Sequence, residues 1–583
     1  MRTDWDLEVL YKGFDDPAFE ADIKAMEEAF AALHQAVEKA PETEQPQRTE
    51  NLLLSMEKIR TVSGKVGLYA SLRTSTNSQD TEAIAALARI GRISSKGSAD
   101  LSAAKKILGK TENLEELVSL SPVVKEYEVL IKDAEQEAKH LLSDEAESIA
   151  SVMDLTGGSA WGDLQSFLTS TLKVEYRDKV ITLSEVRNLA SSLDAEERKD
   201  AYFAELKSYE KVQDPVAFAL NNIKNQVNAM AEKRGYESSL MQTLEDSKMT
   251  RDTLDALIGS MKKYMPVFRK YLKKKGELLG DQNGLKFYNL FAPMGSLDKV
   301  YSVEVARDEL VKVFSDLTPE MGAMMQEAFD NGWIDFFPKA GKSGGAFCAS
   351  ARSLKQSRIL TNFDGTFGAV DTLAHELGHA YHNLMQKDIS ILNGGSCMQV
   401  AETASTFNET YLGAWALKNA STRDERLALL DSDLREKTQT VVDIYSRYLF
   451  ETAVFEQAKD RFLMAPDLCE LMLKAQDESY GDGLDPEYRH PYMWLCKSHY
   501  YSSGLSFYNF PYAFGSLFAE GLYALYLKDP EDFLPKYREM LKTTGIHSVE
   551  ECAQMMGVDL TKPDFWEESL KMIAEEIEEF CSL

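Results

Sequence analysis

The sequence predicts a mostly α-helical fold with a few short strands. Proline is scarce, with 16 residues among 583, about half the usual ~5%, so long uninterrupted helices are permitted. Apolar residues recur every three or four positions through most of the chain, which is the spacing of a helix that buries one face. The longest break in this spacing is residues 336–360, where glycines and serines alternate with short apolar pieces.

The first third of the chain is expected to be helical almost throughout. A first helix is predicted to begin at Asp16-Pro17, where a capping side chain precedes a proline at the first helical position. Its apolar residues follow at steps of four and three, at Phe19, Ile23, Met26, Phe30, Leu33 and Val37. Further helical patterns cover residues 48–74, 80–108, 112–120, 123–153 and 158–172.

Residues 173–183 break the helical pattern. They alternate and carry β-branched residues around a central Asp178-Lys179, which favours a small hairpin. Ser184 and Ser192 are predicted to begin the next helices. We place a domain boundary near residue 195, so residues 1–195 form an N-terminal helical domain and residues 196–583 a second domain.

The second domain is expected to be helical on both sides of a short sheet. Residues 196–336 have a helical pattern, and helices resume near Ala369 and continue towards the C-terminus. Between them, Gly344–Ala349 and Arg358–Phe363 are predicted to be short strands of a small antiparallel sheet.

Charge and cysteine content restrict the class of protein. The net charge is 65 − 94 = −29, so phosphate backbones and anionic membrane surfaces would repel the chain. No apolar stretch is long enough to span a bilayer, and the first residues lack the apolar core of a signal peptide. The six cysteines are scattered and form no CxxC pair. We expect a cytoplasmic protein without nucleic-acid or membrane partners.

Residues 375–379 read His-Glu-Leu-Gly-His, the HExxH pattern of zinc peptidases. On a helix, positions i and i+4 share one face, so His375 and His379 can close on one Zn²⁺ at about 2.0–2.1 Å. Glu376 lies beside them, where it can act on a water at the metal. Only eight histidines occur in the chain, and two stand here in register. We therefore expect one zinc ion per chain.

The third ligand is expected to come from a second helix. His382 is too far along the zinc helix, because seven residues correspond to about 10.5 Å. Ser396 and Gln399 form a capping-box pattern at the start of a following helix. That helix carries Glu402 and Glu409 on one face, and a buried carboxylate there would need a partner such as zinc.

These motifs resemble the oligoendopeptidase F family, whose wider relatives are the thimet-type oligopeptidases. The similarity lies in His375–Ala380, the Val400–Ser405 segment after a Gly-Gly loop, and Gly344–Phe347. It extends to Trp5–Tyr11 near the N-terminus and to the His499–Tyr501 and Phe507–Tyr512 segments, so it spans essentially the whole chain.

The resemblance implies a large helical zincin-type metallopeptidase with a deep internal channel, covered by the N-terminal domain, that admits only short peptides. It implies that His375, His379 and Glu402 bind the metal and that Glu376 is the catalytic acid–base residue. It assigns His499, Tyr508 and Tyr512 to a cluster that stabilises the tetrahedral intermediate. Because Ser502-Ser503-Gly504 departs from the thimet-type glycine-rich loop, Tyr500 and Tyr501 are alternatives. Glu409 is predicted to accept a hydrogen bond from a ligand imidazole.

The function favoured by these features is zinc-dependent cleavage of internal peptide bonds. An intact Glu376 argues against a catalytically silent helical protein that only binds peptides or zinc. The chain lacks the GxMEN-type loop of aminopeptidases. The ligand types suit zinc, although Co²⁺ or Mn²⁺ could replace it.

The segment before the zinc motif is predicted to bind substrate. If Gly344, Gly345, Ala346 and Phe347 form an edge strand, its free backbone groups can pair with an extended peptide. Residues 336–363 contain no acid but five basic residues, Lys339, Lys342, Arg352, Lys355 and Arg358. Arg352 is the first choice to bind the C-terminal carboxylate of a substrate. The alternative is a basic loop that pairs with acidic neighbours.

Overall fold

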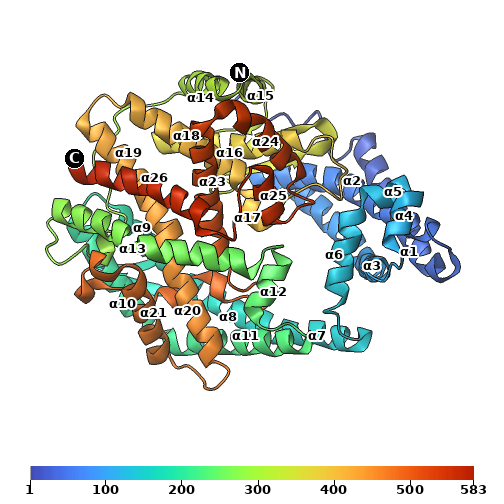
Figure 1. Ribbon diagram of the computed structural model, residues 1–583, viewed down its shortest axis with the longest axis horizontal. Coiled ribbons are helices and arrows are strands. Elements are labelled where there is room, and N and C mark those ends of the chain that lie inside the picture. Colours follow the sequence, from blue (N-terminus) through green and yellow to red (C-terminus); the bar gives the residue numbers. More distant parts are fainter. Residues whose placement is uncertain (1) are drawn as a thin grey trace.

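The computed structural model describes residues 2–583 and is mostly helical, as predicted, with two small sheets (Figure 1). The helices of the first third are α1 Pro17–Lys39, α2 Gln47–Thr76, α3 Thr81–Leu108, α4 Leu114–Leu120, α5 Pro122–Glu126, α6 Glu128–Ala138, α7 Asp144–Thr156 and α8 Gly158–Thr171. Asp16 caps α1 through a hydrogen bond from Ala18 N, and the predicted apolar stripe faces inward except for the half-buried Val37.

The predicted helix over 123–153 is wrong, because three helices occupy this range. Ser121 caps α5 and Ser143 caps α7, each accepting a hydrogen bond from a backbone N–H three residues on. These two serines offered local start signals that the apolar spacing concealed.

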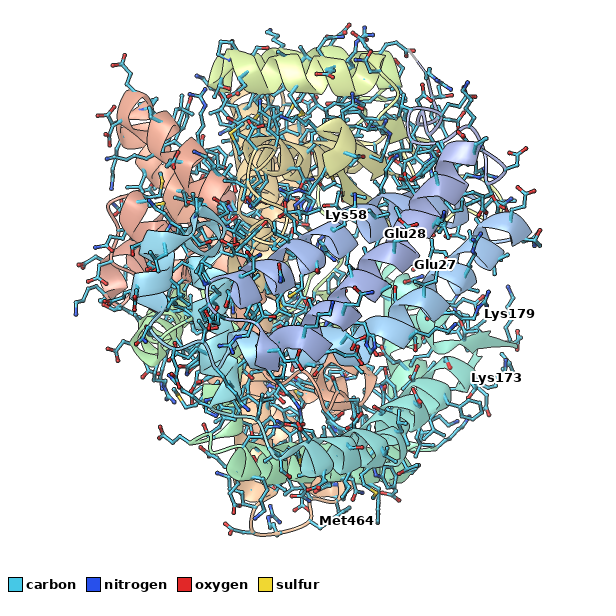
Figure 2. All side chains as sticks on the ribbon, turned by 90° about the vertical axis from the view of Figure 1, so that its right-hand side faces the viewer. Glu27, Glu28, Lys58, Lys173, Lys179 and Met464 are labelled. Atoms are coloured by element: carbon cyan, nitrogen blue, oxygen red, sulfur yellow. The ribbon has the colours of Figure 1, made fainter. Side chains whose placement is uncertain are left out.

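The predicted hairpin is confirmed. Strands β1 Lys173–Tyr176 and β2 Lys179–Thr182 pair antiparallel. Figure 2 shows Lys173 and Lys179 of this hairpin at the edge of the molecule, pointing outward. The helices after it begin elsewhere than predicted: Thr182, not Ser184, caps α9 Leu183–Asn188, and Asp194, not Ser192, caps α10 Ala195–Tyr209.

The second sheet precedes the HExxH helix and has the order β3-β5-β4. Its strands are β3 Ile334–Asp335, β4 Phe347–Ala351 and β5 Gln356–Leu360. β4 and β5 are antiparallel as predicted, whereas β3 adds a parallel strand that was not predicted. Both predicted strands are displaced by a few residues, and Gly344–Ala346 precede β4. At Gly345, φ is +74°, a turn conformation that favours glycine.

The remaining helices precede and follow this sheet along the chain. They are α11 Gln213–Lys233, α12 Ser239–Asp246, α13 Arg251–Leu279, α14 Val303–Leu317, α15 Pro319–Asp330, α16 Phe367–Met385, α17 Met398–Ala401, α18 Thr403–Asn419, α19 Arg423–Lys437, α20 Ile444–Gln457, α21 Ala465–Ser479, α22 Met493–Cys496, α23 Phe510–Lys528, α24 Pro530–Thr543, α25 Val549–Met555 and α26 Pro563–Ser582. A π-helical turn at Thr438–Asp443 joins α19 to α20. No helix within residues 2–583 combines the length and apolarity needed to cross a membrane.

Buried apolar residues form two hydrophobic cores. The smaller core takes its residues from positions 5–134 together with Leu360, and the larger core takes its residues from position 172 onward. In Figure 1, α1–α6 of the smaller core lie to the right, and the C-terminal helices lie to the left and centre. Ile359 belongs to the larger core and its neighbour Leu360 to the smaller, so β5 contributes to both.

Helices α16 and α18 approach each other closely at Gly378. A Cβ atom at this position would lie 2.5 Å from the Ala404 carbonyl oxygen and 2.6 Å from Ser405 Cα. Such distances are shorter than van der Waals contact, so only glycine fits without moving one of the helices. α18 packs in turn against α23, and α16, α18 and α23 lie together in Figure 1.

We expect Gly378→Ala to lower the free energy of unfolding by about 1–3 kcal/mol, because the added methyl group overpacks the helix contact. Urea unfolding measures this loss. Gly259→Ala on α13 is the matched control, since nothing lies within 4 Å of a Cβ there. The control should be neutral or gain about 0.5–1 kcal/mol from its lower unfolded-state entropy. Equal stability of the two variants would contradict the packing role of Gly378.

Candidate active site

His375, His379 and Glu402 converge on one point. Glu402 Oε2 lies 3.3 Å from His375 Nε2 and 3.1 Å from His379 Nε2. One ligand atom from each of the three residues lies within 4.8 Å of the others. The histidines project from one face of α16, and Glu402 comes from the segment beyond the loop, as the sequence predicted.

This donor set fits a tetrahedral zinc ion. Two zinc–ligand bonds of about 2.0–2.1 Å at the tetrahedral angle place the ligand atoms about 3.3–3.4 Å apart. The two His–Glu separations are close to this value, and two imidazole nitrogens with one carboxylate leave a fourth position open, as catalytic zinc sites do.

The backbone around Glu402 differs from the predicted helix. Ser396 is not a cap, because α17 begins after Cys397 and has no side-chain cap. The helix ends at Ala401, and α18 begins at Thr403, so Glu402 stands at the break between them. Its side chain is 50% exposed, so the premise of a buried carboxylate was wrong. Ser405 Oγ donates to Glu402 Oε2 at 2.9 Å and orients the carboxylate.

Glu376 lies between the two histidines in the sequence, and its side chain is buried. It lines a cavity that His375, His379 and Glu402 also line. It is 5% exposed, and its Oε2 atom has no hydrogen-bond partner within the described chain. Burial raises the pKa of Glu376, and the nearby Glu402 and Glu409 act in the same direction, while the two histidines oppose them. A carboxyl group held in this way accepts a proton more readily than an exposed carboxylate does.

Glu409 lies on the other side of His375. Its Oε1 atom is 3.0 Å from His375 Nδ1, the nitrogen that does not face Glu402. Although burial acts to lower the pKa of His375, the two carboxylates raise it to about 11. The contacts with His375 and His379 hold the pKa of Glu402 well below its ordinary value, although burial opposes them. The site is thus strongly attractive to positive charge.

His382 is not part of this set. It is buried, and its Nε2 atom lies 2.8 Å from Thr544 Oγ1. Burial lowers the pKa of His382 to about 4, so the ring is neutral. The rejection of His382 as a third ligand agrees with this geometry.

A cavity of about 550 Å³ opens over the ligand set. Ala346 and Phe347 line it together with His375, Glu376 and Glu402. β4 is the edge of its sheet, so the predicted edge strand does lie beside the zinc helix. Gly344 and Gly345 form the turn that leads into β4 instead, and Asn362 Nδ2 donates to the Gly345 carbonyl at 2.9 Å.

Arg352 does not line this cavity. The prediction that it binds the C-terminal carboxylate of a substrate is therefore wrong. Its guanidinium donates to the main-chain carbonyls of Gln386 and Ile389 and closely approaches Gly394. Arg352 thereby holds the loop that follows α16. The sequence did not indicate this contact, because its members are more than thirty residues apart.

The other basic residues of this segment are also engaged. Lys339 and Lys342 pair with Asp335, and Lys355 pairs with Asp388. Arg358 is fully buried, and its Nε atom donates to the Asp6 carbonyl at 3.0 Å. Pairing with acidic neighbours, the alternative considered for this segment, therefore describes the three lysines.

His499, Tyr508 and Tyr512 lie together. Their ring centroids are 5.3 Å apart for His499 and Tyr508, 6.0 Å for His499 and Tyr512, and 5.4 Å for the two tyrosines. Tyr512 is 40% exposed and stands one turn of α23 before Gly515, where a Cβ would lie 3.8 Å from Glu402 Cβ. Burial, the Tyr508 hydroxyl and Glu402 raise the pKa of Tyr512.

Burial and the nearby cations Arg447 and Lys497 lower the pKa of His499. The alternatives Tyr500 and Tyr501 are buried, and the Tyr501 hydroxyl donates to the Trp494 carbonyl at 3.1 Å. Of the four tyrosines considered, only Tyr508 and Tyr512 stack with His499.

A buried carboxylate that the sequence did not reveal holds the tyrosine segment. Glu451 of α20 accepts hydrogen bonds from Phe507 N at 3.1 Å and Asn509 Nδ2 at 2.7 Å, on either side of Tyr508. Lys224 of α11 donates to the same carboxylate at 2.7 Å, and both charges are fully buried. No motif marks this pair, because its members are separated by more than two hundred residues.

Known peptidases are similar to this chain over most of its length. The model of peptidase family M3 matches residues 188–572, and the oligopeptidase F model matches residues 110–173. Oligopeptidase PepF of Bacillus subtilis is 25% identical over 81% of this chain and 71% of its own length. An oligoendopeptidase F homolog of Lactococcus lactis is 25% identical over 100% of this chain and 97% of its own.

Solved structures share the fold. A Chlamydophila abortus protein described as a candidate peptidase superposes with a TM-score of 0.88 at 22% identity, covering 100% of this chain and 98% of its own. Oligoendopeptidase F from Enterococcus faecium gives a TM-score of 0.70 at 20% identity and covers 96% of this chain and 98% of its own. At such identities the likeness concerns the fold alone.

We expect Glu402→Ala to lose bound zinc and Glu409→Ala to weaken zinc binding by about 10–100-fold, the usual loss when the partner of a ligand imidazole is removed. Metal analysis of the purified proteins measures the first effect, and competition with a chelator measures the second. Glu135→Ala, which removes an exposed acid on α6, is the control. Loss of zinc from Glu409→Ala but not from Glu402→Ala would reverse the two roles.

Proposed function

Because the chain belongs to peptidase family M3, we propose that it is a zinc-dependent endopeptidase that hydrolyses internal bonds of short peptides. The predicted resemblance to oligoendopeptidase F is confirmed by the matching models and relatives. The finer proposal rests on one observation: the side chains of His375, His379 and Glu402 converge beside the buried Glu376 at the wall of one cavity.

His375, His379 and Glu402 would hold the zinc ion, with Glu409 fixing the orientation of the His375 ring. When bound, zinc lowers the pKa of a water molecule from 15.7 to about 7 and polarises a carbonyl group. Glu409 Oε1, 3.0 Å from His375 Nδ1, would accept a hydrogen bond from the proton on that nitrogen, which leaves Nε2 free as a ligand.

Glu376 performs the proton transfers in this proposal. Its free carboxylate oxygen accepts a proton from the attacking water and delivers it to the nitrogen of the leaving amine. Burial supports this role, because a raised pKa makes the protonated carboxyl group available for the second transfer.

Tyr512, Tyr508 and His499 are proposed to stabilise the developing oxyanion. Tyr512 stands one turn of α23 before Gly515, which approaches Glu402, so its hydroxyl is the first candidate donor. Tyr508 and His499 pack against its ring and restrict where that hydroxyl points. Removing a donor of this kind typically costs about 10²–10³ in rate.

The substrate backbone is proposed to pair with β4, whose outer edge faces no other strand of the described sheet. Pairing through the main chain would allow varied sequences to bind. Trp5, from the N-terminal segment, packs 6.3 Å from Phe347 and supports this strand. Restriction to short peptides by an enclosing channel, and a cytoplasmic location consistent with the scattered thiols, remain parts of the proposal.

Glu376→Gln tests the proposed chemistry. We expect kcat for internally quenched peptides to fall by about 10²–10⁴, the usual contribution of a general base, while zinc content stays normal. Peptides of increasing length, with and without a chelator, measure the dependence on zinc and size. A variant that keeps more than a few per cent of the wild-type kcat would contradict the role of Glu376. A wild-type protein that binds but never cleaves peptides would favour the silent binding protein.

Glu451 tests whether the tyrosine segment must be held in place. Glu451→Ala leaves Lys224 buried without a partner and should cost about 3–5 kcal/mol in stability. The double variant Lys224→Met/Glu451→Leu removes both charges and should recover most of that loss. It still lacks the acceptor for Phe507 N and Asn509 Nδ2, so we expect its kcat to fall with little change in KM. Wild-type kcat in a stable double variant would contradict the positioning role.

A further inference from the structure

A second cavity of about 400 Å³ lies apart from the one over the zinc ligands and shares no lining residue with it. It is enclosed by α9, α10, the segment Phe287–Phe291, the π-helical turn and α22. Its volume is within the range of sites that bind small molecules or parts of peptides.

Two cations of the cavity wall, Arg198 and Lys497, form no ion pair within the described residues. Lys497 lines the cavity, and within residues 2–583 its Nζ atom forms no ion pair and donates no hydrogen bond. Arg198 is 4% exposed and donates only to neutral acceptors, Asn289 Oδ1 at 3.0–3.1 Å and the Ser192 carbonyl at 2.7 Å. Buried cations without anionic partners are costly, and an anionic ligand would offset that cost.

The two carboxylates that line the cavity are already occupied. Glu205 accepts a hydrogen bond from the Tyr209 hydroxyl at 2.7 Å and lies 3.7 Å from Arg187. Asp443 pairs with Arg447 and accepts a hydrogen bond from Tyr480. With Arg187 facing Glu205 and Arg447 paired with Asp443, Arg198 and Lys497 leave an excess of positive charge inside a chain whose net charge is −29.

His490 adds a polar group without a partner. It is 1% exposed and lines the cavity, and neither ring nitrogen makes a hydrogen bond within the described chain. Its Nε2 atom is 3.5 Å from Glu205, too far and too poorly aligned for a hydrogen bond. Aromatic rings complete the wall, with Tyr202 and Phe287 beside the imidazole. The lining thus suits an anionic group attached to an apolar body.

The cavity adjoins the proposed catalytic cluster. Lys497 is two residues from His499 along the chain, and Lys497 and Arg447 are close enough to His499 to affect its charge.

We propose that this cavity binds the C-terminal carboxylate and last apolar side chain of a peptide, with Lys497 as the principal cation. The proposal rests on the proposed peptidase function and extends it to how one end of the substrate is held. The site is distinct from Arg352, whose guanidinium is engaged elsewhere.

Binding to zinc-loaded Glu376→Gln tests the proposal without turnover. One unlabelled peptide with an apolar last residue is made as the free acid and as the C-terminal amide, and both are titrated by calorimetry. We expect the acid to bind about tenfold or more tightly than the amide, the gain of one charge-assisted hydrogen bond. Adding Lys497→Met should abolish the difference, while the control Lys262→Met, at an exposed lysine paired with Glu478, should preserve it.

Each outcome decides a separate point. Equal affinity of acid and amide in Glu376→Gln, or a full acid preference after Lys497→Met, overturns the carboxylate site. The first comparison needs no change in the cavity, so it does not depend on whether the Lys497 variant folds. Cleavage by the wild-type enzyme is measured in parallel. A wild type that cleaves neither peptide, together with no binding to Glu376→Gln, overturns the proposed function itself.

Discussion

The site depends on how closely two helices can approach. α16 supplies two histidines, and the chain entering α18 supplies the carboxylate that meets them. At Gly378, inside the HExxH motif, the backbone of α18 occupies the space of a side chain. One of the two variable positions of the motif is therefore set by helix packing rather than by metal chemistry. Glu402 lies at the break between α17 and α18, and from there its carboxylate contacts both histidines.

Charges that are far apart in sequence support the two halves of the site. Behind the metal ligands, Glu409 contacts His375, and Asp371 and Glu436 line a compact acidic pocket around it. Lys437 partly neutralises this pocket by pairing with Asp433, Glu520 and Glu576. Near the tyrosines, Lys224 neutralises the buried carboxylate of Glu451 in the same way. Removing Lys437, or either member of the Lys224–Glu451 pair, would leave a buried charge unpaired.

The sequence predicts correctly those features whose residues lie within one helical turn or one hairpin of each other. His375, Glu376 and His379 follow from one turn of helix, and the hairpin follows from alternation over ten residues. The His499 and Tyr508 assignments came from family resemblance, because nothing in their spacing indicates that their rings meet. Arg352 was assigned by charge alone, and its true partners are carbonyls that only the folded loop brings near. Glu451 and Lys224 were missed because a buried ion pair across two helices has no sequence pattern.

Strand β5 links the site to the cooperativity of unfolding. Ile359 and Leu360 point to opposite faces of one strand, and each belongs to a different hydrophobic core. Neither core can lose its packing without releasing one face of the strand that pairs with β4. The strand proposed to hold the substrate would therefore lose its order in the first partial unfolding event, whichever core opens. If the smaller core opened first, the molecule would retain α16, which packs in the larger core, without a template for the peptide backbone.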